Sequence, residues 1–262
     1  MAANFEVIPG DPQSPVILHV PHSSRFIPAD VRSELLLSDS ELLAELNSMT
    51  DSRTDEIALS ATEKSLLKPW LFINRFSRLV IDPERFPDDR EIMNKVGMGA
   101  VYRKTSTGSD LRSPEFKGEK ALLDAYFHPY AKALEELVTN RLEQVGSAII
   151  IDVHSYRPEQ HVNAVNPGQK RPAMCLGTDE FHTPQSLTDS ARSSFSRLGD
   201  VYENEPYAGT YVPLKYYGID SRVSSIMMET RADTFLDQAY EFHTGSADVI
   251  DGLVALISSV RI

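Results

Sequence analysis

Short apolar runs alternate with longer amphipathic segments along this chain. The apolar runs have the length of buried strands and cover residues 16–20, 70–73, 79–81, 148–153, 174–176 and 225–228. The amphipathic segments place apolar residues at helical spacing and cover about 30–47, 50–67, 119–144, 185–198 and 246–260. Strands that alternate with helices predict an α/β fold with a mixed or mainly parallel sheet.

Several positions refine this pattern. Residues 148–153 are apolar on both faces, as in a central strand of a sheet that is covered on both sides. Pro129 should kink the segment 119–144, and Gly146 should end it. Residues 83–117 form a long polar connection of the kind that usually carries function. No repeat or clear linker divides the chain, so we expect a single domain over residues 1–262.

Composition excludes several classes of function. The net charge of −12 argues against a face that binds nucleic acid and against docking on anionic lipid. No apolar run is long enough to span a membrane, and the N-terminal residues lack the pattern of a signal peptide. Cys175 is the single cysteine, so an internal disulfide or a Cys-rich zinc module is excluded. We therefore expect a soluble cytoplasmic protein in which any metal is held by His and carboxylate side chains.

Two histidines follow strong strand patterns. His22 comes after the run 16–20, and His154 comes after the run that starts at residue 148. In open α/β sheets the site lies at the carboxyl ends of the strands, where two parallel neighbours can direct side chains to one point. Neutral imidazole is the commonest zinc ligand. The alternative is that both rings only bind loop backbone, but the shared position favours metal ligation.

A third protein ligand is available in the segment Thr50 to Asp55. Asp51 and Asp55 are four residues apart, so a helix that begins near residue 50 would place them on one face. One carboxylate would then bind the metal while the other supports a ligand histidine or Arg53. We favour Asp51 as the ligand because it begins the predicted helix. A role of Asp51 at a helix N-terminus, or a surface ion pair with Arg53, would explain these acids equally well.

Glu229 directly follows a third apolar run, in the segment Ser225 to Arg231. A carboxylate at this position is a candidate general base that acts on water activated by a metal. The alternative role is a structural ion pair with Arg231 or Lys215.

Arginines gather between residues 75 and 85, at Arg75, Arg78 and Arg85. Guanidinium groups bind carboxylates in a bidentate manner, so these residues are candidate anchors for an acidic substrate. Pairing with the nearby Asp82, Asp88 and Asp89 is the competing interpretation. No Walker motif or nucleophile elbow is present. A dyad of Cys175 with a histidine stays open, although Cys175 lies in an apolar run typical of a core.

Six segments, in this order, make the chain resemble the N-formylglutamate amidohydrolase family. They are residues 20–24 (Val-Pro-His-Ser-Ser), 50–55, 77–82 with Arg85 and 87–89, 128–130 (His-Pro-Tyr), 151–155 (Ile-Asp-Val-His-Ser) and 228–231. The family is similar to the zinc carboxypeptidase and aspartoacylase group. The resemblance implies a three-layer α/β/α fold, one zinc ion held by two His and one acid, and a Glu as general base.

The resemblance also implies roles for particular residues. It places zinc on His22, His154 and Asp51 or Asp55, and the general base at Glu229. Arg78 would stabilise the oxyanion, Arg75, Arg85 and Arg231 would bind the substrate carboxylates, and Asp55 and Ser155 would support the metal ligands.

The implied substrate is a small N-acyl amino acid such as N-formylglutamate. The family's usual Asp-Leu-Asn-Arg is Asp82-Pro-Glu-Arg85 here, and residues 216–222 also differ, so another N-acyl amino acid or small amide stays open as the substrate. A protein that binds small molecules without catalysis or without metal is the alternative. The sequence leaves the oligomeric state open.

Overall fold

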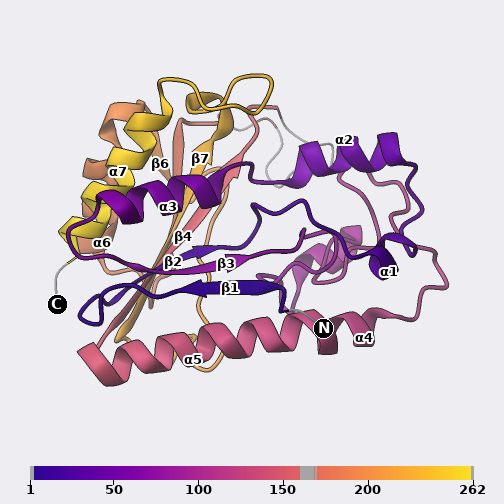
Figure 1. Cartoon of the computed structure of the whole chain (residues 1–262), viewed down its shortest axis with the longest axis horizontal. Coiled ribbons are helices and arrows are strands. Elements are labelled where there is room, and N and C mark those ends of the chain that lie inside the picture. The colour runs from indigo at the N-terminus through magenta and orange to yellow at the C-terminus, as the bar shows by residue number, and fades with distance from the viewer. Residues whose placement is uncertain (1–2, 160–167, 169, 261–262) are drawn as a thin grey trace.

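The computed structural model describes residues 3–159, 168 and 170–260. Within this part of the chain, seven strands form one sheet in the order β1-β3-β2-β4-β7-β5-β6 (Figure 1). The strands are β1 (Phe5–Ile8), β2 (Val16–Val20), β3 (Trp70–Asn74), β4 (Ala148–Tyr156), β5 (Met174–Gly177), β6 (Val201–Glu203) and β7 (Val223–Arg231).

The central strands run in one direction. β3, β2, β4 and β7 are neighbours in parallel register, whereas β1 pairs antiparallel with β3 and β5 pairs antiparallel with β7. The predicted mixed, mainly parallel sheet is therefore confirmed. Because β2, β4 and β7 are parallel, their carboxyl ends meet at one edge of the sheet, where a site is expected.

Helices cover both faces of the sheet. The helices are α1 (Ala29–Arg32), α2 (Asp39–Met49), α3 (Thr54–Lys64), α4 (Glu119–Leu122), α5 (His128–Val145), α6 (Gln185–Ser194) and α7 (Ser246–Ser259). α3, α6 and α7 lie on one face and the long α5 lies on the other, which gives the three layers that the family resemblance implied (Figure 1). No helix in the described ranges is long and apolar enough to cross a membrane.

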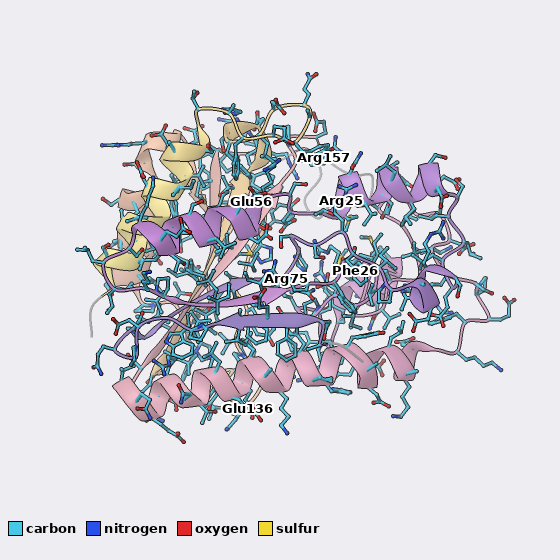
Figure 2. All side chains as sticks on the ribbon, in the orientation of Figure 1. Arg25, Phe26, Glu56, Arg75, Glu136 and Arg157 are labelled. Atoms are coloured by element: carbon cyan, nitrogen blue, oxygen red, sulfur yellow. The ribbon has the colours of Figure 1, made fainter. Side chains whose placement is uncertain are left out.

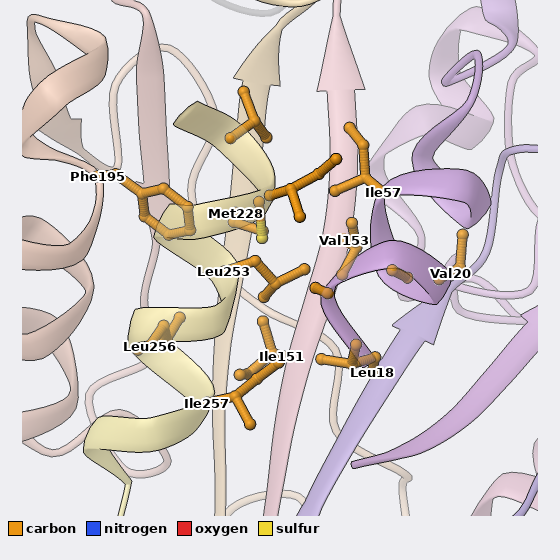
Figure 3. Close-up of a cluster of buried hydrophobic side chains, with 14 of the residues drawn as sticks. Leu18, Val20, Ile57, Ile151, Val153, Phe195, Met228, Leu253, Leu256 and Ile257 are labelled. Atoms are coloured by element: carbon orange, nitrogen blue, oxygen red, sulfur yellow. The ribbon is translucent and has the colours of Figure 1, made fainter. Parts of the chain in front are cut away.

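The alternation of side chains along the strands separates the core from the site. Figure 3 shows Leu18 and Val20 of β2, with Ile151 and Val153 of β4, in the cluster under α3 and α7. Side chains of a strand alternate between the two faces, so the residues between these positions face the α5 side. His19 of β2 and the side chains of Asp152 and His154 of β4 are therefore on the α5 face, near the carboxyl ends of the strands.

Several elements differ from the sequence-based prediction. The predicted strand at 79–81 is wrong: these buried residues form a turn, in which the amide of Val80 donates to the carbonyl of Ser77. The segment 30–47 is divided into α1 and α2 because Ser38 caps the start of α2. The apolar pattern did not reveal β1 and β6, which are short and lie at the edges of the sheet.

The long helical segment also differs in one respect. A π-helical turn covers Leu123–Phe127, and α5 begins at His128, so Pro129 lies in the first turn of α5 rather than at a kink in its middle. Proline has no amide hydrogen to donate and is tolerated in a first turn. Gly146 ends α5 with a left-handed backbone, as predicted.

Candidate metal centre and cavity

Three buried side chains converge at the carboxyl edge of the sheet. The Nδ1 atoms of His22 and His154 are 3.3 Å apart. Oδ2 of Asp51 is 3.0 Å from Nδ1 of His154 and 3.7 Å from Nδ1 of His22. Two imidazoles and one carboxylate therefore direct ligand atoms to one point.

The backbone fixes the carboxylate in this position. The amide of Asp51 donates to the carbonyl of His22 at 3.0 Å, and the hydroxyl of Thr54 donates to the carbonyl of Asp51 at 2.9 Å. Arg53 has a left-handed backbone with φ of 62°, so α3 begins at Thr54 rather than near residue 50. Asp51 thus precedes the helix and lies beside the histidines.

Asp55 lies elsewhere. Because it is inside α3, it does not share a helical face with Asp51, and its Oδ2 accepts from Nη1 of Arg75 at 3.2 Å. Arg75 also donates from Nε to Glu6 at 2.8 Å. Figure 2 shows Arg75 between α3 and β1. The structure therefore places neither Asp55 nor Arg75 at the cluster of His22, Asp51 and His154.

Further carboxylates lie behind the two histidines. Oδ1 of Asp82 is 2.9 Å from Nε2 of His22, and Oδ1 of Asp152 is 3.2 Å from Nε2 of His154. Asp82 in turn accepts from Arg78 and from the Tyr102 hydroxyl, each at 2.7 Å. Burial alone would raise the pKa of Asp82, but the Arg78 guanidinium and His22 hold that pKa well below its usual range. A carboxylate at Nε2 leaves Nδ1 of His22 available to a metal.

The electrostatics of the cluster suit a divalent cation. Burial alone would raise the pKa of Asp51, but hydrogen bonds from His154 and His22 lower it below its usual range. Two Nδ1 atoms that face each other at hydrogen-bond distance can share only one proton, whereas both can bind one metal ion. Ligand atoms about 2.0–2.1 Å from tetrahedral zinc are about 3.4 Å from each other, which agrees with the observed separations. The residues therefore fit a zinc ion.

Glu229 lies beside this cluster. It is the register partner of His154 on the adjacent strand, and its Oε2 is buried without a hydrogen-bond partner among the described residues. Burial raises the pKa of Glu229 to about 8. The ion-pair alternative has no support, because Arg231 pairs with Asp233 at 2.7 Å and Lys215 pairs with Glu135 at 3.6 Å.

A cavity of about 880 Å³ opens beside the cluster and Glu229. Its walls include Arg78, Arg85 and Ser155 from the predicted set, but not Arg75 or Arg231. Arg231 is directed to Asp233 at the end of β7 because that carboxylate is two residues away. The structure thus brings two of the four predicted arginines to the cavity.

Sequence reasoning missed an arginine and a glutamate in the same cavity. Arg171 donates to the Tyr207 hydroxyl at 2.7 Å and leaves Nη1 buried without a hydrogen-bond partner among the described residues. Glu84 extends toward both histidines, with its Oε2 3.3 Å from Nε2 of His154. Arg171 follows a connection without periodic pattern, so no sequence signal pointed to it. Glu84 lies next to Arg85, and the sequence pattern indicated only the arginine as a candidate site residue.

The comparisons with known proteins agree with this architecture. A family model described as N-formylglutamate amidohydrolase matches residues 14–236. The crystal structure of N-formylglutamate amidohydrolase from Ralstonia eutropha JMP134 is similar with a TM-score of 0.79 and 20% identity, over 98% of this chain and 96% of that chain. A gene product of Agrobacterium tumefaciens is similar with a TM-score of 0.71 and 21% identity, over 98% of this chain and 94% of that chain. No curated protein matches the sequence.

Proposed function

Because the chain belongs to the N-formylglutamate amidohydrolase family, we propose that it is a zinc-dependent hydrolase of N-acyl amino acids such as N-formylglutamate. The observation that carries the proposal is the convergence of His22, Asp51 and His154 on one point, with Glu229 beside them in the wall of a cavity. Two imidazoles, one carboxylate and a nearby Glu are the parts that metal-assisted amide hydrolysis requires.

In this proposal His22, Asp51 and His154 hold the metal. A zinc ion held there supplies Lewis-acid activation of water and of the amide carbonyl. Asp82 keeps the ring of His22 in the orientation that directs Nδ1 to the metal, because it forms a hydrogen bond with Nε2 of that ring. Asp152 lies 3.2 Å from Nε2 of His154, on the side of that ring opposite to Asp51.

Glu229 is the proposed proton carrier. It accepts a proton from the attacking water and delivers it to the nitrogen of the leaving amine. Burial raises the pKa of Glu229 to about 8 in the metal-free protein, and a divalent cation beside it lowers this pKa toward neutrality. A carboxyl group with a pKa near the working pH is suited to both halves of this transfer. The absence of a hydrogen-bond partner for Oε2 within the described residues leaves that atom free to contact water or substrate.

Arginines in the cavity bind the negative charges of the reaction. Arg78, held by Asp82, is positioned to donate to the oxyanion that develops on the carbonyl oxygen. Arg85 and Arg171 are the proposed anchors for substrate carboxylates, because both line the cavity and Nη1 of Arg171 is buried without a hydrogen-bond partner among the described residues. An acidic amino acid product fits these cationic groups in a protein that is negative overall.

A thiol mechanism has little support. Cys175 is buried, and its Sγ donates to the carbonyl of Tyr207 at 3.2 Å. Burial raises the pKa of this thiol to about 11, so the nucleophilic thiolate is scarce at neutral pH. This environment is that of a core residue.

A hydrolysis assay with controlled metal content tests the proposal. Purified protein stripped with a chelator should not release glutamate from N-formyl-L-glutamate, and addition of one equivalent of zinc should restore the release. Activity on N-acetyl-L-glutamate, compared with N-formyl-L-glutamate, measures the preference for the acyl group. Activity on N-formyl-L-leucine measures the preference for an acidic side chain. Full activity in the stripped protein would contradict metal dependence, and no activity on any N-acyl amino acid would contradict the proposed reaction.

A further inference from the structure

A second set of potential metal ligands lies on the other side of the His154 ring. His19 of β2, Asp152 of β4 and Glu84 of the turn after β3 bring one ligand atom each to within 4.8 Å of the others. The side chains of His19 and Asp152 are 0% and 2% exposed, and that of Glu84 is 15% exposed. This set shares no residue with His22, Asp51 and His154.

Some polar atoms around this set are satisfied and others are not. Nδ1 of His19 forms a hydrogen bond with Oδ1 of Asp152 at 2.8 Å, whereas an atom of Glu84 and an atom of the adjacent His154 have no such partner among the described residues. Nε2 of His154 is 3.2 Å from Oδ1 of Asp152 and 3.3 Å from Oε2 of Glu84, yet it makes no hydrogen bond to either. Oε1 of Glu84 is buried without a hydrogen-bond partner among the described residues, although Nδ1 of His19 is 3.6 Å away. Buried polar groups are normally satisfied, so atoms that converge in this way indicate a missing partner between them.

The orientation of His19 agrees with metal binding. Its Nε2 is 2.6 Å from the hydroxyl of Tyr130 in α5, and its Nδ1 faces Asp152 and Glu84. A histidine that binds a metal through one ring nitrogen usually donates the hydrogen of the other to a nearby oxygen. Tyr130 provides that oxygen and fixes the ring.

The charges around this set also agree with the binding of a divalent cation. Asp152 and Glu84 bring two carboxylates beside the imidazoles of His19 and His154, and with both rings neutral these two negative charges match one divalent cation. Arg78 and Arg85 offer no direct compensation, since both are directed to Asp82.

We propose that His19, Asp152 and Glu84 form a second divalent metal site, separated from the first by the imidazole ring of His154. The proposed hydrolysis needs only the first site, so this inference goes beyond it. The second ion offsets the two buried carboxylates and keeps Asp152 and Glu84 in place against the ring of His154.

The number of zinc ions bound per chain tests the proposal. Metal-free protein is dialysed against zinc, and bound zinc is measured by elemental analysis. Wild type is expected to bind two ions, whereas Glu84→Gln and Asp51→Asn are each expected to bind one, because each loses a different site. Glu135→Gln is the matched control and should bind two, because Glu135 lines the same cavity but pairs with Lys215 and belongs to neither proposed site. Circular dichroism checks the fold, and Glu84→Asn replaces Glu84→Gln if the latter does not fold.

The outcomes separate this inference from the proposed function. A wild-type protein that binds one ion, which Glu84→Gln retains, overturns the second site whatever the activity. A single ion that is lost in Glu84→Gln but kept in Asp51→Asn supports the second site and contradicts the metal centre of the proposed function. Two ions together with no hydrolysis of any N-acyl amino acid support the second site and contradict the proposed reaction alone.

Discussion

His154 of β4 and Glu229 of β7 are direct register partners in the parallel part of the sheet. Their backbones are joined by the hydrogen-bond ladder of two central strands, so the distance between a proposed metal ligand and a proposed proton carrier is set by the most rigid part of the fold. Both side chains lie on the α5 face, since Val153 and Met228 occupy the opposite core. A site built on strands in this way holds its geometry without the help of a loop.

Glu229→Gln should separate proton transfer from every other role of this residue. We expect kcat to fall by roughly 100- to 10,000-fold, the usual contribution of general acid–base catalysis. KM, zinc content and the melting temperature of the zinc-loaded protein should change little, because Gln is nearly isosteric and Glu229 has no ion-pair partner to lose among the described residues. Steady-state kinetics, metal analysis and thermal melts measure these quantities. Glu135→Gln, the same change in a residue paired with Lys215, should keep kcat within about twofold of wild type. A folded, zinc-loaded Glu229→Gln with normal kcat would leave the proton carrier unassigned.

The two aspartates near α3 should behave differently when each is changed to Asn. Asp51→Asn is expected to lose zinc from the first site and to abolish activity, because the amide is a poor ligand for zinc. Asp55→Asn should keep both the zinc ion and the activity, because it removes only a partly exposed ion pair with Arg75. Such a pair contributes less than about 1 kcal/mol to the free energy of unfolding. Metal analysis of the two proteins decides between them. Retention of zinc in Asp51→Asn and its loss in Asp55→Asn would reverse the assignment.

Most of the proposed centre could be predicted because its residues are close to strong strand patterns. His22, His154 and Glu229 each lie at or just beyond an apolar run, and parallel strands bring such positions together. The apolar pattern itself was less informative at residues 79–81, where burial occurs in a turn. Burial alone does not distinguish a strand from a turn that packs into a core.

The arginines show what the sequence leaves undetermined. Arg75 and Arg78 are three residues apart in the segment after β3, but Arg75 is directed to Glu6 and Asp55 while Arg78 is directed to Asp82. Arg78 pairs with Asp82, which is only four residues away, and the sequence offered that pairing as an alternative. The partners of Arg75 are 69 and 20 residues away, so only the fold brings them near. Arg171 could not be found for the same reason, since its partner Tyr207 is 36 residues away.

The metal-free protein should lose stability as the pH rises because of Glu229. Burial raises the pKa of this group from 4.5 to about 8 in the folded protein. Between these values the folded state holds a proton that the unfolded state has released, so the stability contributed by Glu229 is full below about pH 4.5 and is lost as the pH approaches 8. The slope is at most about 1.4 kcal/mol per pH unit for one proton. Melting temperatures of metal-free wild type and Glu229→Gln from pH 4.5 to 8 provide the test. The decrease should be smaller in the variant, and parallel curves would contradict the raised pKa.

Arg171→Ala tests whether Arg171 binds a substrate carboxylate. Arg171 lies in the cavity wall but outside the arginine-rich segment 75–85. A lost charge-assisted hydrogen bond costs about 1.5–3 kcal/mol, so KM for an N-acyl glutamate should rise by about 10- to 150-fold, with a smaller effect on kcat. Arg75→Ala is the matched control, because Arg75 lies outside the cavity and pairs with Glu6 and Asp55. Its KM should stay within about twofold of wild type, at a small cost in stability. Steady-state kinetics of both variants on the same substrate decide the matter. If KM instead rises in Arg75→Ala and not in Arg171→Ala, the anchor is the arginine that the sequence favoured, and the cavity wall around Arg171 does not contact the substrate.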